Sequence, residues 1–217
     1  ATCPTYQLLG DELDGPRGRI YLIKQVLEGK QVTEKTRLHL DRCLTCRSCE
    51  TTCPSGVKYS HLLDIGRQVV EEKLQRKGGD ALMRWTLRET LTRPGIFGPA
   101  VKLGQLLRPL LPSGLADKLP PEAAGGTRPW PAKAAHSRRM LALAGCVQPA
   151  LAPNINAATA RVLDKLGIEL FEESKAGCCG AVRFHLNDQD AARNDMRRNI
   201  DAWWPHVEAG VEAIVVT

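Results

Sequence analysis

Four cysteines stand within eleven positions of the stretch DRCLTCRSCETTCPSG, residues 41–56, and a proline follows the last of them. Thiolates bind soft metal ions and iron–sulfur clusters, and they also form disulfides. Disulfide frameworks join distant loops, whereas cysteines three or four residues apart cannot pair with one another without strain. The spacing therefore predicts a metal or redox site in a reducing compartment.

Cys43, Cys46, Cys49 and Cys53 follow the pattern C-x2-C-x2-C-x3-C-P, which ligates [4Fe–4S] clusters in bacterial ferredoxins. Three cysteines at intervals of three wrap one tight loop, so their sulfur atoms converge on one cluster. The fourth cysteine ligates the other cluster in two-cluster ferredoxins. A structural zinc site is the alternative, but zinc ligands usually come as two separated C-x2-C pairs. We therefore interpret the run as iron–sulfur ligands.

Cys3 stands alone near the start of the chain, in the tripeptide TCP, which recurs around Cys53. If Cys53 serves another cluster, the cluster of the other three cysteines in the run needs a fourth ligand. We predict that Cys3 supplies this ligand, and that the cluster served by Cys53 takes its remaining ligands from cysteines upstream of Ala1. A buried free thiol is the alternative interpretation of Cys3.

Three further cysteines each follow a predicted parallel strand: Cys146 in LAGCVQP, and Cys178 and Cys179 in AGCCGA. The carboxyl ends of parallel strands meet at one edge of a sheet, where ligands bind. Neighbouring glycines would allow the backbone to approach a cluster closely. Three thiols do not close a conventional site, so we expect another cysteine loop beyond Thr217. Buried apolar cysteines and a vicinal disulfide remain the alternatives to a metal site.

The composition restricts the class of protein. The chain has 217 residues, 43% of them hydrophobic, which is enough for one or two ordinary cores. Its net charge of +6 comes from scattered basic residues, with no aromatic-rich RNA-binding signature, so nucleic acid is not a predicted partner. No apolar run approaches the roughly 20 residues that span a bilayer. We therefore expect a soluble or peripheral protein.

Hydrophobic periodicity divides the chain into three regions that would position these cysteines. Residues 1–77 are predicted to form a helical two-cluster ferredoxin-type domain. Residues 78–137 are rich in proline and are predicted to be a connector with short helical pieces. Residues 138–217 alternate strand and helix in the order βαβαβ, which indicates a parallel sheet. The predicted fold class is α+β overall, a helical [4Fe–4S] domain followed by an α/β domain.

Two helices of the first region have predicted apolar faces. The first follows the turn GPRG at residues 15–18, and the second follows the tripeptide PSG at residues 54–56. Their predicted core residues are Ile20, Ile23, Val26 and Leu27 in the first helix, and Leu62, Ile65, Val69 and Leu74 in the second.

The chain resembles the iron–sulfur subunits of bacterial glycolate oxidase (glycolate dehydrogenase) in three stretches: CPTYQLLGDELDGPRGRIYLIKQVLEG, HLDRCLTCRSCETTCPSGVKYSHLLDIGR and NINAATARVLDKLGIELFEESKAGCCGAVRFHLN. That family has two ferredoxin-type cysteine runs followed by two cysteine-rich CCG domains, which it shares with heterodisulfide reductase subunits. The resemblance places Cys43–Cys53 in the second run and Cys3 at the end of the first. It places Cys146, Cys178 and Cys179 in the first CCG domain. It also implies that the chain is truncated at both ends relative to the family.

The resemblance implies an electron-transfer role. In the family, glycolate is oxidised to glyoxylate by hydride transfer to FAD on partner subunits, and electrons then pass singly toward a quinone or another acceptor. The implied cofactors are two [4Fe–4S] clusters and a further cluster in the CCG domain, with FAD only on the partners of a hetero-oligomer. The implied location is the cytoplasm or the inner face of the cytoplasmic membrane.

No catalytic residue is expected on this chain itself. No G-x-G-x-x-G follows a predicted strand, and no histidine or carboxylate is poised beside an anion-binding arginine to take a proton from a 2-hydroxy acid. Near the cysteine run, Arg42, Arg47 and Lys58 would favour the reduced cluster by their charge, or would simply be solvated surface.

Two alternative functions remain. The first is an electron-transfer subunit of another complex, such as a different 2-hydroxy-acid dehydrogenase, an anaerobic glycerol-3-phosphate dehydrogenase or a heterodisulfide reductase-like assembly. Under this alternative, every prediction about the clusters and their cysteine ligands stays the same. The second is a structural zinc protein.

Overall fold

The computed structural model describes residues 2–117, 119, 129–131 and 136–217, without the side chain of Leu115. The chain divides into two compact units, Ala1–Leu82 and Met83–Thr217. Residues 118, 120–128 and 132–135 of the predicted connector lie outside the described residues. The boundaries predicted at residues 77 and 137 therefore stay predictions.

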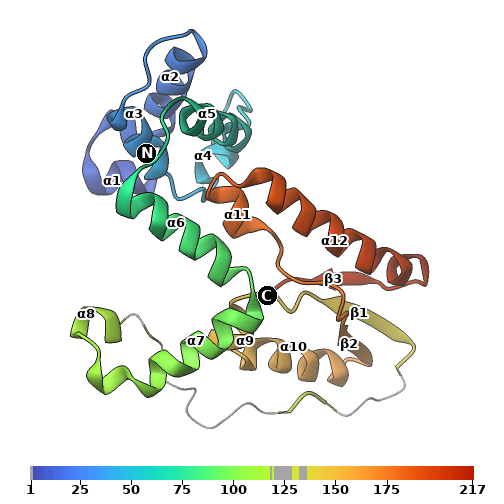
Figure 1. Cartoon of the computed structure of the whole chain (residues 1–217). Coiled ribbons are helices and arrows are strands. Elements are labelled where there is room, and N and C mark those ends of the chain that lie inside the picture. The colour runs from blue at the N-terminus through green and yellow to red at the C-terminus, as the bar shows by residue number, and fades with distance from the viewer. Residues whose placement is uncertain (1, 118, 120–128, 132–135) are drawn as a thin grey trace. The chain divides into compact units, whose positions relative to one another are not determined.

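The first unit is helical, as the sequence predicts (Figure 1). Prolines at the first positions of two of its helices suit an N-terminus, because proline lacks the amide hydrogen that would be unpaired there. The Thr33 hydroxyl caps a third helix by accepting a hydrogen bond from the Thr36 amide. The elements are α1 (Pro4–Leu9), η1 (Glu12–Asp14), α2 (Pro16–Leu27), α3 (Glu34–Asp41), α4 (Ser48–Thr51) and α5 (Tyr59–Lys73), and α6 (Gly78–Leu91) contains the residue at which the units divide.

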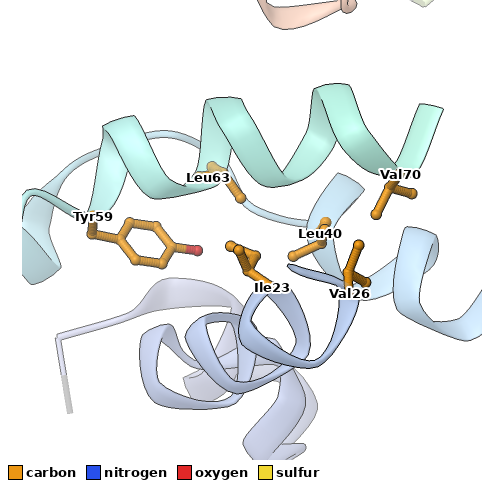
Figure 2. Packing of buried hydrophobic residues seen from close by; sticks show 6 residues of the cluster. All are labelled: Ile23, Val26, Leu40, Tyr59, Leu63 and Val70. Atoms are coloured by element: carbon orange, nitrogen blue, oxygen red, sulfur yellow. The ribbon is translucent and has the colours of Figure 1, made fainter. Parts of the chain in front are cut away.

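The core of the first unit lies between α2, α3 and α5 (Figure 2). Gly66 of α5 allows a close helix approach, because a Cβ atom there would lie 2.6 Å from Cγ1 of Ile23. The buried residues are Ile23 and Val26 of α2, Leu40 of α3, and Tyr59, Leu63 and Val70 of α5.

The buried face of α5 differs from the predicted one. Leu63, Gly66 and Arg67 are buried, whereas Ile65, predicted to lie in the core, is 51% exposed. Of the predicted residues, Val69 does pack against the core, whereas the placement of Ile65 was wrong. The buried stripe contains a glycine and an arginine, which do not register in hydrophobic periodicity. In α2, Leu27 is likewise exposed rather than buried.

The second unit contains a three-stranded parallel sheet of order β2-β1-β3, which confirms the predicted parallel pairing. Met140 of β1 lies opposite Leu170 of β2 and Ala213 of β3. Helix α10 packs against β2, and Ala160 of α10 shares a small core with the sheet. The elements are α7 (Pro94–Leu106), η2 (Arg108–Leu110), α8 (Ser113–Ala116), β1 (Arg138–Ala142), α9 (Gln148–Leu151), α10 (Asn154–Lys165), β2 (Ile168–Glu172), α11 (Ala181–His185), α12 (Gln189–Glu208) and β3 (Ala213–Val215).

Helix α11 was not predicted from the sequence.

Among the described residues, no helix combines the length and the apolar character needed to cross a membrane.

The packing of α5 leads to a stability prediction. Replacing Leu63, which is fully buried, by alanine should lower the free energy of unfolding by about 2–5 kcal/mol, because it removes core contacts and leaves a cavity. Ile65→Ala in the same helix is the matched control and should change it by less than about 0.5 kcal/mol. Chemical denaturation of the three proteins measures both effects. If Ile65→Ala lowered the free energy of unfolding as much as Leu63→Ala does, the assignment of Ile65 to the exposed face of α5 would be contradicted.

Candidate metal centres

The cysteine loop between α3 and α4 has an unusual backbone. Thr45 and Arg47 have φ angles of 52° and 59°, in the left-handed region that non-glycine residues rarely adopt. Left-handed residues that alternate with right-handed ones turn successive backbone N–H groups toward one side and create a concave anion-binding surface. Arg47 and the helical Ser48 after it form one such left-handed and right-handed pair, so this part of the loop has a backbone that suits a negatively charged group.

Four cysteines from two distant segments line one cavity. The loop contributes Cys43, Cys46 and Cys49, and the start of the chain contributes Cys3. The thiols are close enough to influence one another electrostatically: Cys3 acts on both Cys46 and Cys49. Four thiols around one cavity fit the donor set of a [4Fe–4S] cluster, which takes one cysteine for each iron.

Cys3 lies directly before α1, and its Sγ is 3.5 Å from the Asp14 carbonyl oxygen. Its Sγ is 3.2 Å from Oγ1 of Thr5 and 3.7 Å from Nη1 of Arg19. Burial alone would raise the pKa of Cys3, but hydrogen bonds from the Thr5 side chain, the Tyr6 amide and Arg19 outweigh it and lower the pKa. The environment therefore favours the thiolate, which is the form that binds metal.

The loop cysteines have different environments. The Ser48 hydroxyl and amide lower the pKa of Cys46, whereas burial and the neighbouring Cys43 raise the pKa of Cys49. The Tyr59 hydroxyl lies 3.6 Å from Sγ of Cys43, and its own pKa is raised, first by burial and then by that thiol. Repulsion between several thiolates is the penalty that bound iron would relieve.

Cys53 does not line the cavity shared by the other four cysteines. It borders a second, open cavity instead, which Cys3 and Cys49 also reach. Backbone amides of Val57, Ser55 and Gly56 lower the pKa of Cys53 by hydrogen bonding to its sulfur. Cys53 thus borders a different cavity from the one that the other four cysteines share, and Cys3 and Cys49 border both.

The arginines predicted to lie near the loop carry compensated charges. Arg42 pairs with Asp14 at 2.9 Å, and Arg47 pairs with Glu50 at 2.7 Å. Lys58 is exposed at the start of α5. Sequence reasoning missed Arg19, a buried arginine that lines the four-cysteine cavity together with the exposed Arg47. Its place on the buried stripe of α2, one turn before Ile23, could have revealed it.

The cysteines of the second unit meet at the carboxyl edge of its sheet. Cys146 follows β1 and Cys178 follows β2, and their Sγ atoms are 3.5 Å apart. Both are buried, whereas the neighbouring Cys179 is exposed. The prediction that the parallel strands would bring two of these cysteine loops together agrees with this geometry.

Helix α12 holds the loop of Cys178 in place. The Asn199 amide donates to the Cys178 carbonyl at 3.0 Å, and its Oδ1 accepts from the Gly177 amide at 2.8 Å. A Cβ atom at Gly180, whose φ is +83°, would lie 2.7 Å from the Ala192 carbonyl oxygen. Residue 180 must therefore be glycine so that α12 can pack closely against this loop. This reason differs from the one expected from the sequence, which was close contact between the backbone and a cluster.

The three thiols of this site differ in acidity. A hydrogen bond donated by Cys178 lowers the pKa of Cys146 to about 7, although burial opposes the shift. The same hydrogen bond raises the pKa of Cys178, and contact with Cys178 together with burial raises that of Cys179. Cys146 is therefore the thiol that ionises most readily.

Two protein families match the chain. Residues 1–58 match the 4Fe-4S dicluster domain, and residues 140–217 match the cysteine-rich (CCG) domain. These matches support iron–sulfur binding and agree with the predicted order of the two domains.

Two relatives extend the comparison. The chain is 59% identical over 217 residues to the glycolate oxidase iron–sulfur subunit of Escherichia coli (strain K12), covering 100% of this chain and 53% of that protein. It is 29% identical over 228 residues to the probable glycolate oxidase iron–sulfur subunit of Bacillus subtilis (strain 168), covering 93% of this chain and 51% of that protein. No solved structure matches the chain. The chain itself spans about half the length of each of the two relatives.

The first and the last regions of the chain thus match different families. The chain joins a 4Fe-4S dicluster domain to a cysteine-rich domain, and over its full length it is similar to the iron–sulfur subunits of glycolate oxidase.

Proposed function

We propose that the chain is the electron-transfer part of a complex that oxidises glycolate to glyoxylate. The observation that carries the proposal is the cavity lined by Cys3, Cys43, Cys46 and Cys49. The substrate is suggested by the 59% identity to a glycolate oxidase iron–sulfur subunit.

These four cysteines would hold one [4Fe–4S] cluster, and Cys53 would ligate a second whose other ligands precede Ala1. A bound cluster supplies reversible one-electron transfer. The chain's own contribution is to hold thiolates and to point backbone amides at them. Those amides include the three that bond to the sulfur of Cys53.

The cysteine-rich domain would hold a further cluster through Cys146, Cys178 and Cys179. The proposal is supported by the 3.5 Å approach of two of these thiols and by the anchoring of their loop by Asn199.

In the proposed complex, partner subunits would bind FAD, which would supply the acceptor for a hydride from glycolate. This chain would then carry the two electrons away one at a time. The terminal acceptor would be a quinone or another carrier. The assembly would be a hetero-oligomer in the cytoplasm or on the inner face of the membrane.

The assignment of Cys3 to the cluster of the loop cysteines, and of Cys53 to the other cluster, can be tested by substitution. Cys3→Ser and Cys46→Ser should perturb the same EPR signal of the reduced, cluster-loaded protein, because both thiols would serve one cluster. Cys53→Ser is the matched control, and should change a different signal. Loss of different signals in the first two variants would contradict the assignment.

The cysteine-rich site can be tested through the metal content. The double variant Cys146→Ser/Cys178→Ser should contain less iron per chain than the unmodified protein, while the EPR signals assigned by Cys46→Ser and Cys53→Ser persist. Ala142→Ser adds a hydroxyl to the buried end of β1 without removing a thiol, and should keep the full iron content. An unchanged iron content in the double variant would mean that these thiols hold none.

The division of labour between subunits gives the direct functional test. The purified chain, loaded with iron and sulfide, should take electrons from dithionite but stay oxidised when given glycolate. Adding the flavin-bearing partner should allow glycolate to bleach the visible absorption of the clusters. Bleaching by glycolate without any flavoprotein would show that the substrate chemistry resides on this chain.

A further inference from the structure

Arg19 is a buried charge that faces the four-cysteine cavity. The residue is only 1% exposed. An arginine is almost never buried so completely unless it is paired, and Arg19 has several partners. Its Nη1 lies 3.7 Å from Sγ of Cys3, and the residue lines the cavity itself. The guanidinium therefore lies next to a proposed cluster ligand, in a place that water does not reach.

The remaining contacts of Arg19 hold the guanidinium rigidly. Its Nε donates to the His39 carbonyl at 2.7 Å, and its Nη2 donates to Oγ1 of Thr5 at 3.0 Å. The same Nη2 lies 3.4 Å from Oδ1 of Asp14. Groups from α1, η1 and α3 thus fix the orientation in which Nη1 points at the thiol.

The positive charge at this position is not cancelled by its carboxylate. Asp14, which is fully buried, is shared between Arg19, Arg42 at 2.9 Å and the His39 ring at 3.1 Å. Two guanidinium groups share this buried carboxylate, so it does not neutralise Arg19 alone. A further carboxylate, that of Asp11, lies within 4.8 Å of the Asp14 carboxylate and the His39 ring, but Asp11 is exposed, so solvent screens its charge.

We propose that Arg19 raises the reduction potential of the cluster held by Cys3, Cys43, Cys46 and Cys49. The inference rests on the proposed function. Reduction adds one electron to the cluster and breaks no bond, so the reduced form carries one more negative charge. A nearby positive charge stabilises that form, and it acts most strongly where water cannot screen it.

The other arginines near the loop are poorer candidates. The Arg42 side chain is 39% exposed, and that of Arg47, which also lines the cavity, is 64% exposed. Solvent screening weakens the effect of such charges on the cavity. Arg19 is therefore the residue from which the largest effect is expected.

The test is a redox titration of the full-length, cluster-loaded protein, with dithionite as the reductant. It follows the EPR signal that Cys46→Ser identifies. Arg19→Gln should reduce the ratio of reduced to oxidised cluster about tenfold at a given potential, equivalent to about −59 mV for one electron. Arg19→Lys, which keeps the charge, should restore most of this shift.

Two further variants separate the effect of charge from damage to the fold. Asp14→Asn removes the negative member of the same buried pair and should shift the midpoint in the opposite direction. Arg76→Gln is the matched control: this buried arginine pairs with Asp41, Glu71 and Asp80, and should leave the midpoint unchanged.

An unchanged midpoint in Arg19→Gln would overturn the inference. If that variant fails to hold the cluster, Asp14→Asn decides: a raised midpoint supports the inference, and an unchanged or lowered midpoint contradicts it. Failure of the unmodified protein to hold a reducible cluster would instead contradict the proposed function, and the inference with it.

Discussion

The buried ion pair of Asp14 and Arg19 is the contact on which the first unit depends. Through it η1, α1, α2 and α3 meet at one point, because Arg19 also donates to Thr5 and to the carbonyl of His39. Breaking a buried pair leaves an uncompensated charge and typically costs about 3–5 kcal/mol. The pair thus holds the start of the chain, with Cys3, against the helix that leads into the cysteine loop.

A second buried arginine supports the other side of the same loop. Arg67 of α5 donates to the carbonyls of Leu40 and Cys43, at 2.9 and 2.8 Å. The last carbonyls of a helix lack partners within the helix, so a side chain from elsewhere must satisfy them when the end is buried. Arg67 does this for α3, and in doing so it couples the direction of the cysteine loop to the core between α2, α3 and α5.

The second unit positions its thiols by a different constraint. Parallel strands deliver successive loops to one edge of the sheet, and Cys146 and Cys178 follow two neighbouring strands. Asn199 satisfies both the amide before Cys178 and the carbonyl of Cys178 itself. Rigid placement of thiols before a metal arrives lowers the conformational entropy that binding must overcome.

The sequence by itself determined the features that depend on local spacing. The C-x2-C-x2-C-x3-C-P run, the alternation of strand and helix after residue 138 and the order of the domains were all readable, because each depends on neighbours along the chain. The repeated tripeptide TCP also led to the prediction that Cys3 joins the loop cysteines. The tertiary structure alone decided which face of α5 is buried and that Arg19 faces the four-cysteine cavity. These features depend on buried polar side chains and on contacts between distant segments, and hydrophobic periodicity carries no signal for either.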